Sequence, residues 1–123
     1  MTQLRLTLSQ LALLVAYAAG MAGGQILFKA AALRYVPDAA PVDRALSLIF
    51  NGYFFAAIVL YFALTLLWVW LLTFTPLSLA YPFVALAFAI TPLFGGWLFG
   101  EPITLRLLLA IALILSGLVL IAG

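Results

Sequence analysis

The chain has 123 residues, of which 69% are hydrophobic and 7% are charged, and its net charge at neutral pH is +2. This composition is typical of a protein embedded in lipid and excludes a soluble globular domain. The sequence contains no Cys and no His, which excludes disulfides, thiol chemistry and the usual zinc sites, and so small a net charge gives no support for a nucleic-acid partner.

Four hydrophobic stretches are long enough to cross a bilayer, since a helical span needs about 20 apolar residues. Backbone groups in lipid must be satisfied within the segment, and the alternating pattern of barrel strands is missing. The sequence therefore predicts an all-α protein, a four-helix transmembrane bundle. We treat residues 1–123 as a single membrane domain with spans at about 8–33, 48–74, 80–99 and 105–121.

The first span contains the only strongly polar pair within a span, Gln25 and Lys29. Residues four apart share one helical face, so we expect the two to act together, with the amide forming hydrogen bonds and the ammonium binding a phosphate. Alternatively, Lys29 extends its ammonium to the lipid head groups while Gln25 bonds a neighbouring helix. No span carries Asp or Glu in its interior, so proton exchange on a buried acid is not expected.

Glycines in the same span allow two interpretations. Gly20, Gly23 and Gly24 either open room for a ligand or let another helix approach closely. The segment that follows, residues 34–44, holds two Pro and four charged residues and predicts a loop outside the membrane. The distribution of Lys and Arg near the span ends places this loop and the connection at 100–104 in the cytoplasm.

The third span contains two prolines, Pro82 and Pro92, ten residues apart. Each removes a backbone hydrogen bond, which predicts either hinges of the kind found in the broken helices of transporters or static kinks that serve packing. After this span, Glu101 is expected to be an interfacial anchor or cap. Interfacial aromatic residues are predicted at Tyr53, Tyr61, Trp68, Trp70 and Trp97.

The fourth span carries a stripe of small residues, Ala110, Ser116 and Gly117, which predicts a dimer seam. A chain of this size cannot easily surround a pathway, so oligomerisation is expected. Inverted repeats of transporters meet at the midplane, and a half-sized chain obtains that geometry by pairing antiparallel with itself or with a sister subunit.

Two sequence motifs carry a family resemblance. Residues 76–117, together with GGQILFKAA at 23–31, resemble the small four-helix branch of the drug/metabolite transporter superfamily. Within that branch, GQxxFK in the first span and PLSxAYPF in the third are similar to the aminoarabinose-phosphoundecaprenol flippase subunits, which move a lipid-linked sugar across the inner membrane. The resemblance covers about residues 11–122.

The resemblance implies a multi-pass protein of the bacterial inner membrane that moves a lipid-linked sugar or polyprenyl phosphate and works as an antiparallel homodimer or heterodimer. On this hypothesis Lys29, with Arg34, holds the phosphate of the anionic lipid, and Gln25 and Tyr81 contact its polar head. The lipid tails stay in the bilayer beside the first and third spans. Two halves then rock about Pro82, Pro92 and the glycines.

Small multidrug resistance proteins also resemble the chain, but they exchange protons on a Glu of the first span, and the matching position here is Met21. An aromatic residue that usually follows the Tyr of the third span by three positions is Val84 here. Both departures disfavour proton-coupled export. The alternatives are a small-cation or drug exporter and a non-transporting subunit of a larger complex. No catalytic constellation is found, so we expect no enzyme, no cofactor and no metal.

Overall fold

The structure is a computed structural model that describes residues 6–34, 38 and 40–122. Every regular element in this part of the chain is a helix, which confirms the all-α prediction. In chain order the elements are α1 (Leu8–Ala32), α2 (Pro41–Ile49), α3 (Gly52–Leu72), α4 (Leu77–Ala80), the 3₁₀ helix η1 (Tyr81–Val84), α5 (Ala85–Phe99) and α6 (Leu105–Ala122).

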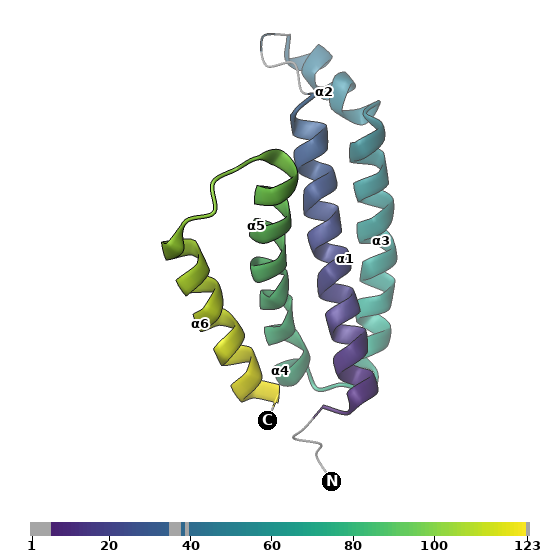
Figure 1. Cartoon of the computed structure of the whole chain (residues 1–123). Helices are drawn as coiled ribbons and strands as arrows, with labels where there is room; N and C mark the ends of the chain where they lie inside the picture. The colour runs from purple at the N-terminus through teal and green to yellow at the C-terminus, as the bar shows by residue number, and fades with distance from the viewer. Residues whose placement is uncertain (1–5, 35–37, 39, 123) are drawn as a thin grey trace.

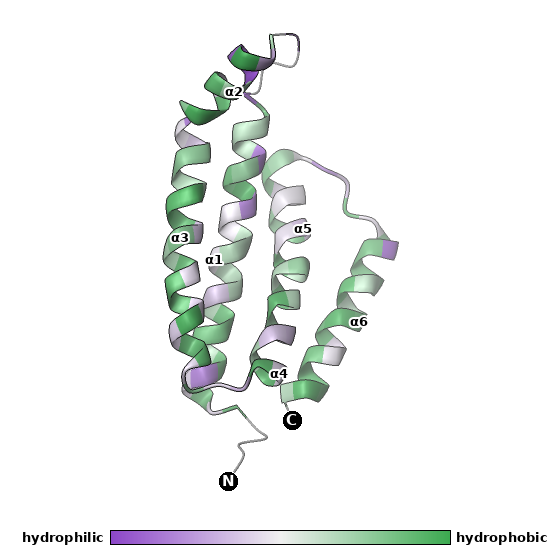
Figure 2. Cartoon of the chain, turned by 180° about the vertical axis from the view of Figure 1, so that it is seen from behind, coloured by the Kyte–Doolittle hydropathy of each residue, from purple (hydrophilic) through white to green (hydrophobic). Residues whose placement is uncertain are grey.

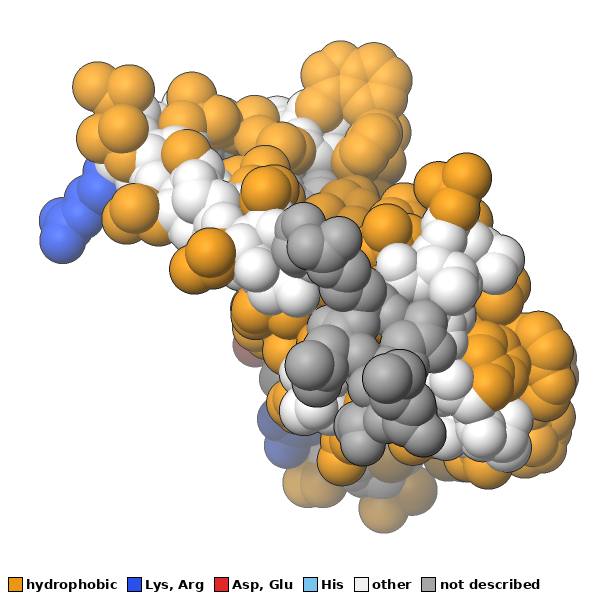
Figure 3. Space-filling model, turned by 90° about the horizontal axis from the view of Figure 1, so that it is seen from below, with side chains coloured by type: hydrophobic (Ala, Val, Ile, Leu, Met, Phe, Trp, Pro, Cys, Tyr) orange, Lys and Arg blue, Asp and Glu red, His pale blue; other side chains and the backbone are white. Residues whose placement is uncertain are grey.

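Four segments are long and apolar enough to cross a bilayer, as predicted. They are α1, α3, the combined segment Leu77–Phe99 and α6. Hydrophobic residues predominate along each of them, and hydrophilic residues lie near the connections and at a few places within α1 (Figure 2). Among the side chains that Figure 3 colours by type in the view from below, apolar ones predominate. The chain is therefore a multi-pass membrane protein.

The helices stand in a row in which α1 and α5 are the inner members (Figure 1). Helix α1 packs against α3 on one side and α5 on the other, and α6 follows beyond α5. Sequential spans are antiparallel, so the start of α1 and the end of α6 lie at the same end of the bundle (Figure 1). The α1–α3 connection and the α5–α6 loop lie at the opposite end.

A buried cluster of Leu14, Leu71, Ala80 and Phe83 joins α1, α3, α4 and η1 near the termini. Gln10 closes this end, because its side-chain amide donates to the carbonyl of Phe74 at 2.9 Å and to the hydroxyl of Thr75 at 3.2 Å. Its oxygen accepts from the backbone of Thr7, which caps α1 in return. Buried polar groups are thus satisfied where the chain turns from α3 into α4.

The second span begins at Gly52 rather than near residue 48. Asn51 caps α3 by accepting from the backbone amides of Tyr53 and Phe54 at 2.9 and 3.4 Å. The preceding residues form the separate helix α2, so the prediction that residues 34–44 are entirely loop is wrong from Pro41 onward. Proline at the start of a helix is favourable because its missing amide has no partner there in any case.

The third span begins at Leu77 instead of residue 80 and changes character at Pro82, where η1 replaces regular α-helix. Pro82 lacks an amide hydrogen, which accounts for a local change of hydrogen bonding at this point. Pro92, in contrast, lies inside the continuous helix α5. Thr104 caps α6, since its hydroxyl accepts from the backbone amide of Leu107 at 3.1 Å.

Candidate functional site: a groove between α1 and α5

Two adjoining cavities lie between the inner helices, and we call them together the α1–α5 groove. One has a volume of about 290 Å³ and the other about 390 Å³. They share Gln25, Thr91 and Pro92. The first also contains Lys29, Gly96 and Glu101, among others, and the second continues along α1 and α5 past Met21, Ala87 and Phe88.

Gln25 and Lys29 line the groove together because they are one turn apart on α1. The structure thus brings together the polar pair that the sequence predicts for the site. Both side chains are exposed in the single chain, so each is accessible to a ligand entering from the side of the bundle. Lys29 lies in the last turn of α1, where the helix dipole favours a cation.

The Gln25 side chain is held by Tyr61 of α3. Its amide nitrogen donates to the Tyr61 hydroxyl at 2.8 Å, and this hydroxyl donates to the carbonyl oxygen of Met21 at 3.0 Å. The Tyr61 ring stacks on Phe28 with 5.4 Å between ring centroids. Because the nitrogen of the amide is engaged with Tyr61, its oxygen is the part of Gln25 left to accept a hydrogen bond from a ligand.

Gly24 makes this arrangement possible. A Cβ atom at Gly24 would lie 2.5 Å from Cε2 of Tyr61, and one at Gly20 would lie 2.8 Å from a terminal carbon of Leu64. At Gly23 the nearest side-chain atom, from Leu60, is 4.0 Å away. Gly20 and Gly24 therefore face α3 and allow it to approach α1, which favours the packing interpretation for these two glycines, while room for a ligand stays a prediction.

The α5–α6 loop brings a carboxylate to the groove. Helix α5 ends at Gly100, which adopts a left-handed conformation with φ of 67°. The loop then lies on Gly96, where a Cβ atom would be 2.7 Å from Ile103 and 3.2 Å from the backbone oxygen of Glu101. This close approach sets the backbone of Glu101 over α5, and Glu101 lines the same cavity as Lys29.

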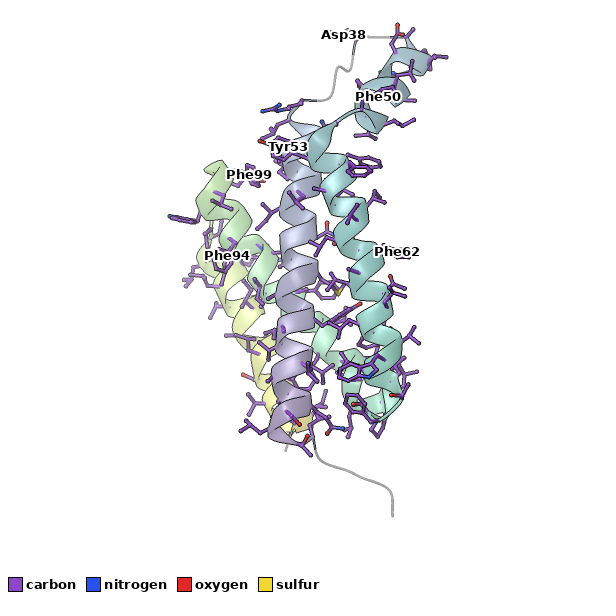
Figure 4. All side chains as sticks on the ribbon, turned by 90° about the vertical axis from the view of Figure 1, so that its right-hand side faces the viewer. Asp38, Phe50, Tyr53, Phe62, Phe94 and Phe99 are labelled. Carbon is purple, nitrogen blue, oxygen red and sulfur yellow. The ribbon has the colours of Figure 1, made fainter. Side chains whose placement is uncertain are left out.

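Two other predicted site residues lie outside the groove. Arg34 places its guanidinium 4.9 Å from the ring centroid of Tyr53, a cation–π contact at the mouth of the bundle. Figure 4 shows Tyr53 at the same end as Asp38 and Phe50. Tyr81 belongs to η1 and lines an apolar hollow with Trp68 near the opposite end. The structure therefore separates Tyr81 from Gln25 and Lys29.

Three residues in or beside the groove are not predicted as site residues from the sequence. Tyr61 is predicted for an interfacial belt, yet it packs inside the bundle against Gly24 and orients Gln25. Thr91 draws no attention because a hydroxyl residue in an apolar span is ordinary, and Glu101 is predicted as an anchor. Gln25 is the feature of the sequence that could have indicated a role for Tyr61, because an amide in an apolar span needs a hydrogen-bond partner.

The small residues of α6 face away from the bundle. Ala110, Ser116 and Gly117 are exposed, and a Cβ atom at Gly117 would meet nothing within 4 Å. The Ser116 hydroxyl donates to the carbonyl of Ala112 at 2.7 Å, within its own helix. This face is available for a neighbour, and the dimer seam stays a prediction.

Comparisons with known proteins point to one kind of membrane protein. No family model and no solved structure matches the chain. A probable 4-amino-4-deoxy-L-arabinose-phosphoundecaprenol flippase subunit ArnE from Sodalis glossinidius is 38% identical over 52 residues, which are 42% of this chain and 47% of the relative. A protein of the same name from Enterobacter sp. (strain 638) is 35% identical over 72 residues, 58% of this chain and 67% of the relative. The matches thus span about half and two thirds of these relatives.

Proposed function

The chain belongs to the family of the 4-amino-4-deoxy-L-arabinose-phosphoundecaprenol flippase subunits, and from this premise we propose that it carries a lipid-linked sugar phosphate of that kind across the bacterial inner membrane. The observation that carries the proposal is the pairing of Gln25 and Lys29 in a groove at the side of an otherwise apolar bundle. An ionisable residue that lines a cavity in a membrane protein marks a functional site by default.

A polyprenyl phosphate sugar has an anionic head and a long apolar tail, which the polar groove and the apolar outer face of α5 suit in turn. Lys29 supplies a point charge for the phosphate, and the oxygen of Gln25 accepts from a sugar hydroxyl. The outer face of α5 carries exposed Phe94 and Leu98. Phe94 points away from α1 and α3 in Figure 4. The head enters the groove while the tail stays in lipid against this face.

Transport needs the head to leave at the opposite side of the membrane. Arg34 lies close to the charged mouth of the bundle, where it gathers phosphate heads from the leaflet before Lys29 binds them. Tyr81 lies near the far end and contacts the head after it has crossed. Rocking about Pro82 and Pro92 connects the two states, since irregular helix at η1 is the kind of break that transporters use.

A second four-helix subunit completes the pathway in this proposal. The groove is open toward lipid, and a single row of helices does not enclose a head group. An antiparallel partner, either another copy or a sister subunit, places its uncharged end beside the charged end of this chain. The exposed face at Ala110 and Gly117 serves as the seam.

The test is leaflet exchange of a fluorescent polyprenyl-phosphate amino sugar in vesicles that contain the purified protein. We expect the wild type to accelerate exchange and Lys29→Ala to slow it by about tenfold or more, because a charged hydrogen bond contributes about 1.5–3 kcal/mol. Arg106→Ala is the matched control, since Arg106 lies in the first turn of α6 at the same end and does not line the groove.

Equal exchange by the wild type and Lys29→Ala, or no exchange by either, would contradict the proposal. The same vesicles separate it from drug export. Under an imposed proton gradient we expect no uptake of a cationic dye, because the spans contain no interior carboxylate to exchange the proton. Gradient-driven dye uptake would favour the exporter alternative instead.

A further inference from the structure

The α1–α5 groove contains a carboxylate as well as a cation. Glu101 lines the 290 Å³ cavity together with Lys29, Gln25 and Thr91. Phosphate binding accounts for Lys29 but not for Glu101, since a carboxylate close to a bound phosphate repels it, most strongly where water is partly excluded. The groove therefore carries one charge more than an anion site needs.

Glu101 has no evident structural task. A cap for α6 is already supplied by Thr104, whose hydroxyl accepts from the amide of Leu107. Glu101 instead follows the C-terminal end of α5, where the helix dipole disfavours a negative charge. Within the part of the chain that the structure describes, Lys29 and Glu101 form no ion pair within 4.0 Å. The two charges face one cavity without neutralising each other.

Contacts and backbone restraints on the α5–α6 loop fix the position of Glu101. Gly100 turns the chain at the end of α5, Ile103 rests on Gly96, and Pro102 restricts the residue before it. With its neighbour along the groove, the cavity reaches the range of about 300–1,000 Å³ in which small-molecule sites fall. Thr91 and Gln25 line both cavities and provide a hydroxyl and an amide oxygen there.

We propose that the groove is a bipolar site for the head of an amino sugar phosphate, in which Lys29 binds the phosphate and Glu101 binds the ammonium of the sugar. Gln25 and Thr91 contact the hydroxyls of the sugar ring. The assignment rests on the proposed function for the class of lipid, and it adds the residue that selects an amino sugar. A neutral sugar leaves Glu101 unpaired beside the phosphate. The groove should therefore bind an amino sugar phosphate more tightly than a neutral sugar phosphate.

Binding of soluble head groups tests this assignment separately from transport. The probes are 4-amino-4-deoxyarabinose 1-phosphate and its N-acetyl derivative, which keeps the phosphate but lacks the positive charge. Their affinities are measured by calorimetry with the full chain in lipid nanodiscs. We expect the wild type to prefer the amine by about tenfold, as for a charge-assisted hydrogen bond.

Glu101→Gln should remove this preference. The affinity for the amine probe should fall, while the affinity for the N-acetyl probe should stay the same or rise. Lys29→Ala should weaken both probes. Asp43→Asn, which removes a carboxylate from exposed α2 at the same end, should keep the wild-type preference. A preference that survives Glu101→Gln, an equal loss of both probes in that variant, or no binding of either probe by the wild type would overturn the bipolar site.

Leaflet exchange in vesicles then addresses the proposed function on its own. Selective binding that depends on Glu101, without lipid exchange, would keep the bipolar site and refute the flippase activity. Lipid exchange without a preference for the amine would keep the flippase activity and refute the bipolar site.

Discussion

At the end of the bundle where α1 meets α2, the side chains include cations and carboxylates, whereas the end near the termini is uncharged throughout the part that the structure describes. The charged end holds Lys29, Arg34, Asp38, Asp43, Arg44, Glu101 and Arg106. At the uncharged end, Gln10 bonds the α3–α4 turn, and Tyr17 stacks on Trp68 with 5.0 Å between ring centroids.

We interpret this difference as a division between an end that stabilises the bundle and an end that carries the proposed site. Near the termini, packed side chains and satisfied polar groups stabilise the turn from α3 into α4, and the hollow of about 860 Å³ beside Trp68 and Tyr81 is lined by no charged residue. Toward the other end, the groove leaves charges facing open space, which costs stability unless a ligand supplies the partners. Substitutions at the two ends should therefore differ in their effects on thermal stability and on lipid exchange.

Gly24→Ala should have the largest effect, because its Cβ would collide with Tyr61, the residue that orients Gln25. Overpacking costs about 1–3 kcal/mol, and each lost hydrogen bond adds about 0.5–1.5 kcal/mol. We expect a lower thermal midpoint in detergent together with slower lipid exchange. Gly23→Ala is the control and should be neutral or stabilising by up to about 1 kcal/mol, since alanine favours helix and nothing crowds that position. Equal changes in thermal midpoint and exchange rate for the two substitutions would show that Tyr61 does not contribute to the site.

Gln10→Ala should lower stability without changing the preference for the amine. The substitution leaves the carbonyl of Phe74 and the hydroxyl of Thr75 without their donor, at a cost of about 1–3 kcal/mol. Thermal unfolding followed by tryptophan fluorescence measures the loss, and Ser9→Ala on the exposed side of the same turn serves as the control. A changed amine preference in Gln10→Ala would show that the two ends are not independent.

The smallest effects should come from a pair of tyrosines. Tyr61→Phe removes two hydrogen bonds at the groove and should slow exchange by about two- to tenfold, since a bond contributes about 0.5–1.5 kcal/mol. In the proposed function Tyr81 contacts the lipid head only on the exit side, so Tyr81→Phe should slow exchange by no more than about twofold. Both rates come from the vesicle measurement. A larger loss of exchange rate for Tyr81→Phe than for Tyr61→Phe would indicate that the site lies at the uncharged end.

Local patterns were enough to predict much of the molecule. Four apolar stretches predict four helices, and a spacing of four places Gln25 and Lys29 on one face, because both features depend only on helix geometry. The cap at Thr104 is equally local. Helix α2 was also within reach, since Pro41 and the apolar residues Val42, Leu46 and Ile49 follow helical spacing.

The contacts between helices were not within reach of the sequence. Glu101 lines the same cavity as Lys29 although 72 positions separate them, Tyr61 bonds Gln25 from α3, and Tyr81 lies near the other end of the bundle. In a soluble protein an apolar stripe shows which face of a helix is buried. The spans of this chain are apolar all round because lipid replaces water, so close approach at Gly20 and Gly24, stacked rings and a few polar bonds decide which faces meet.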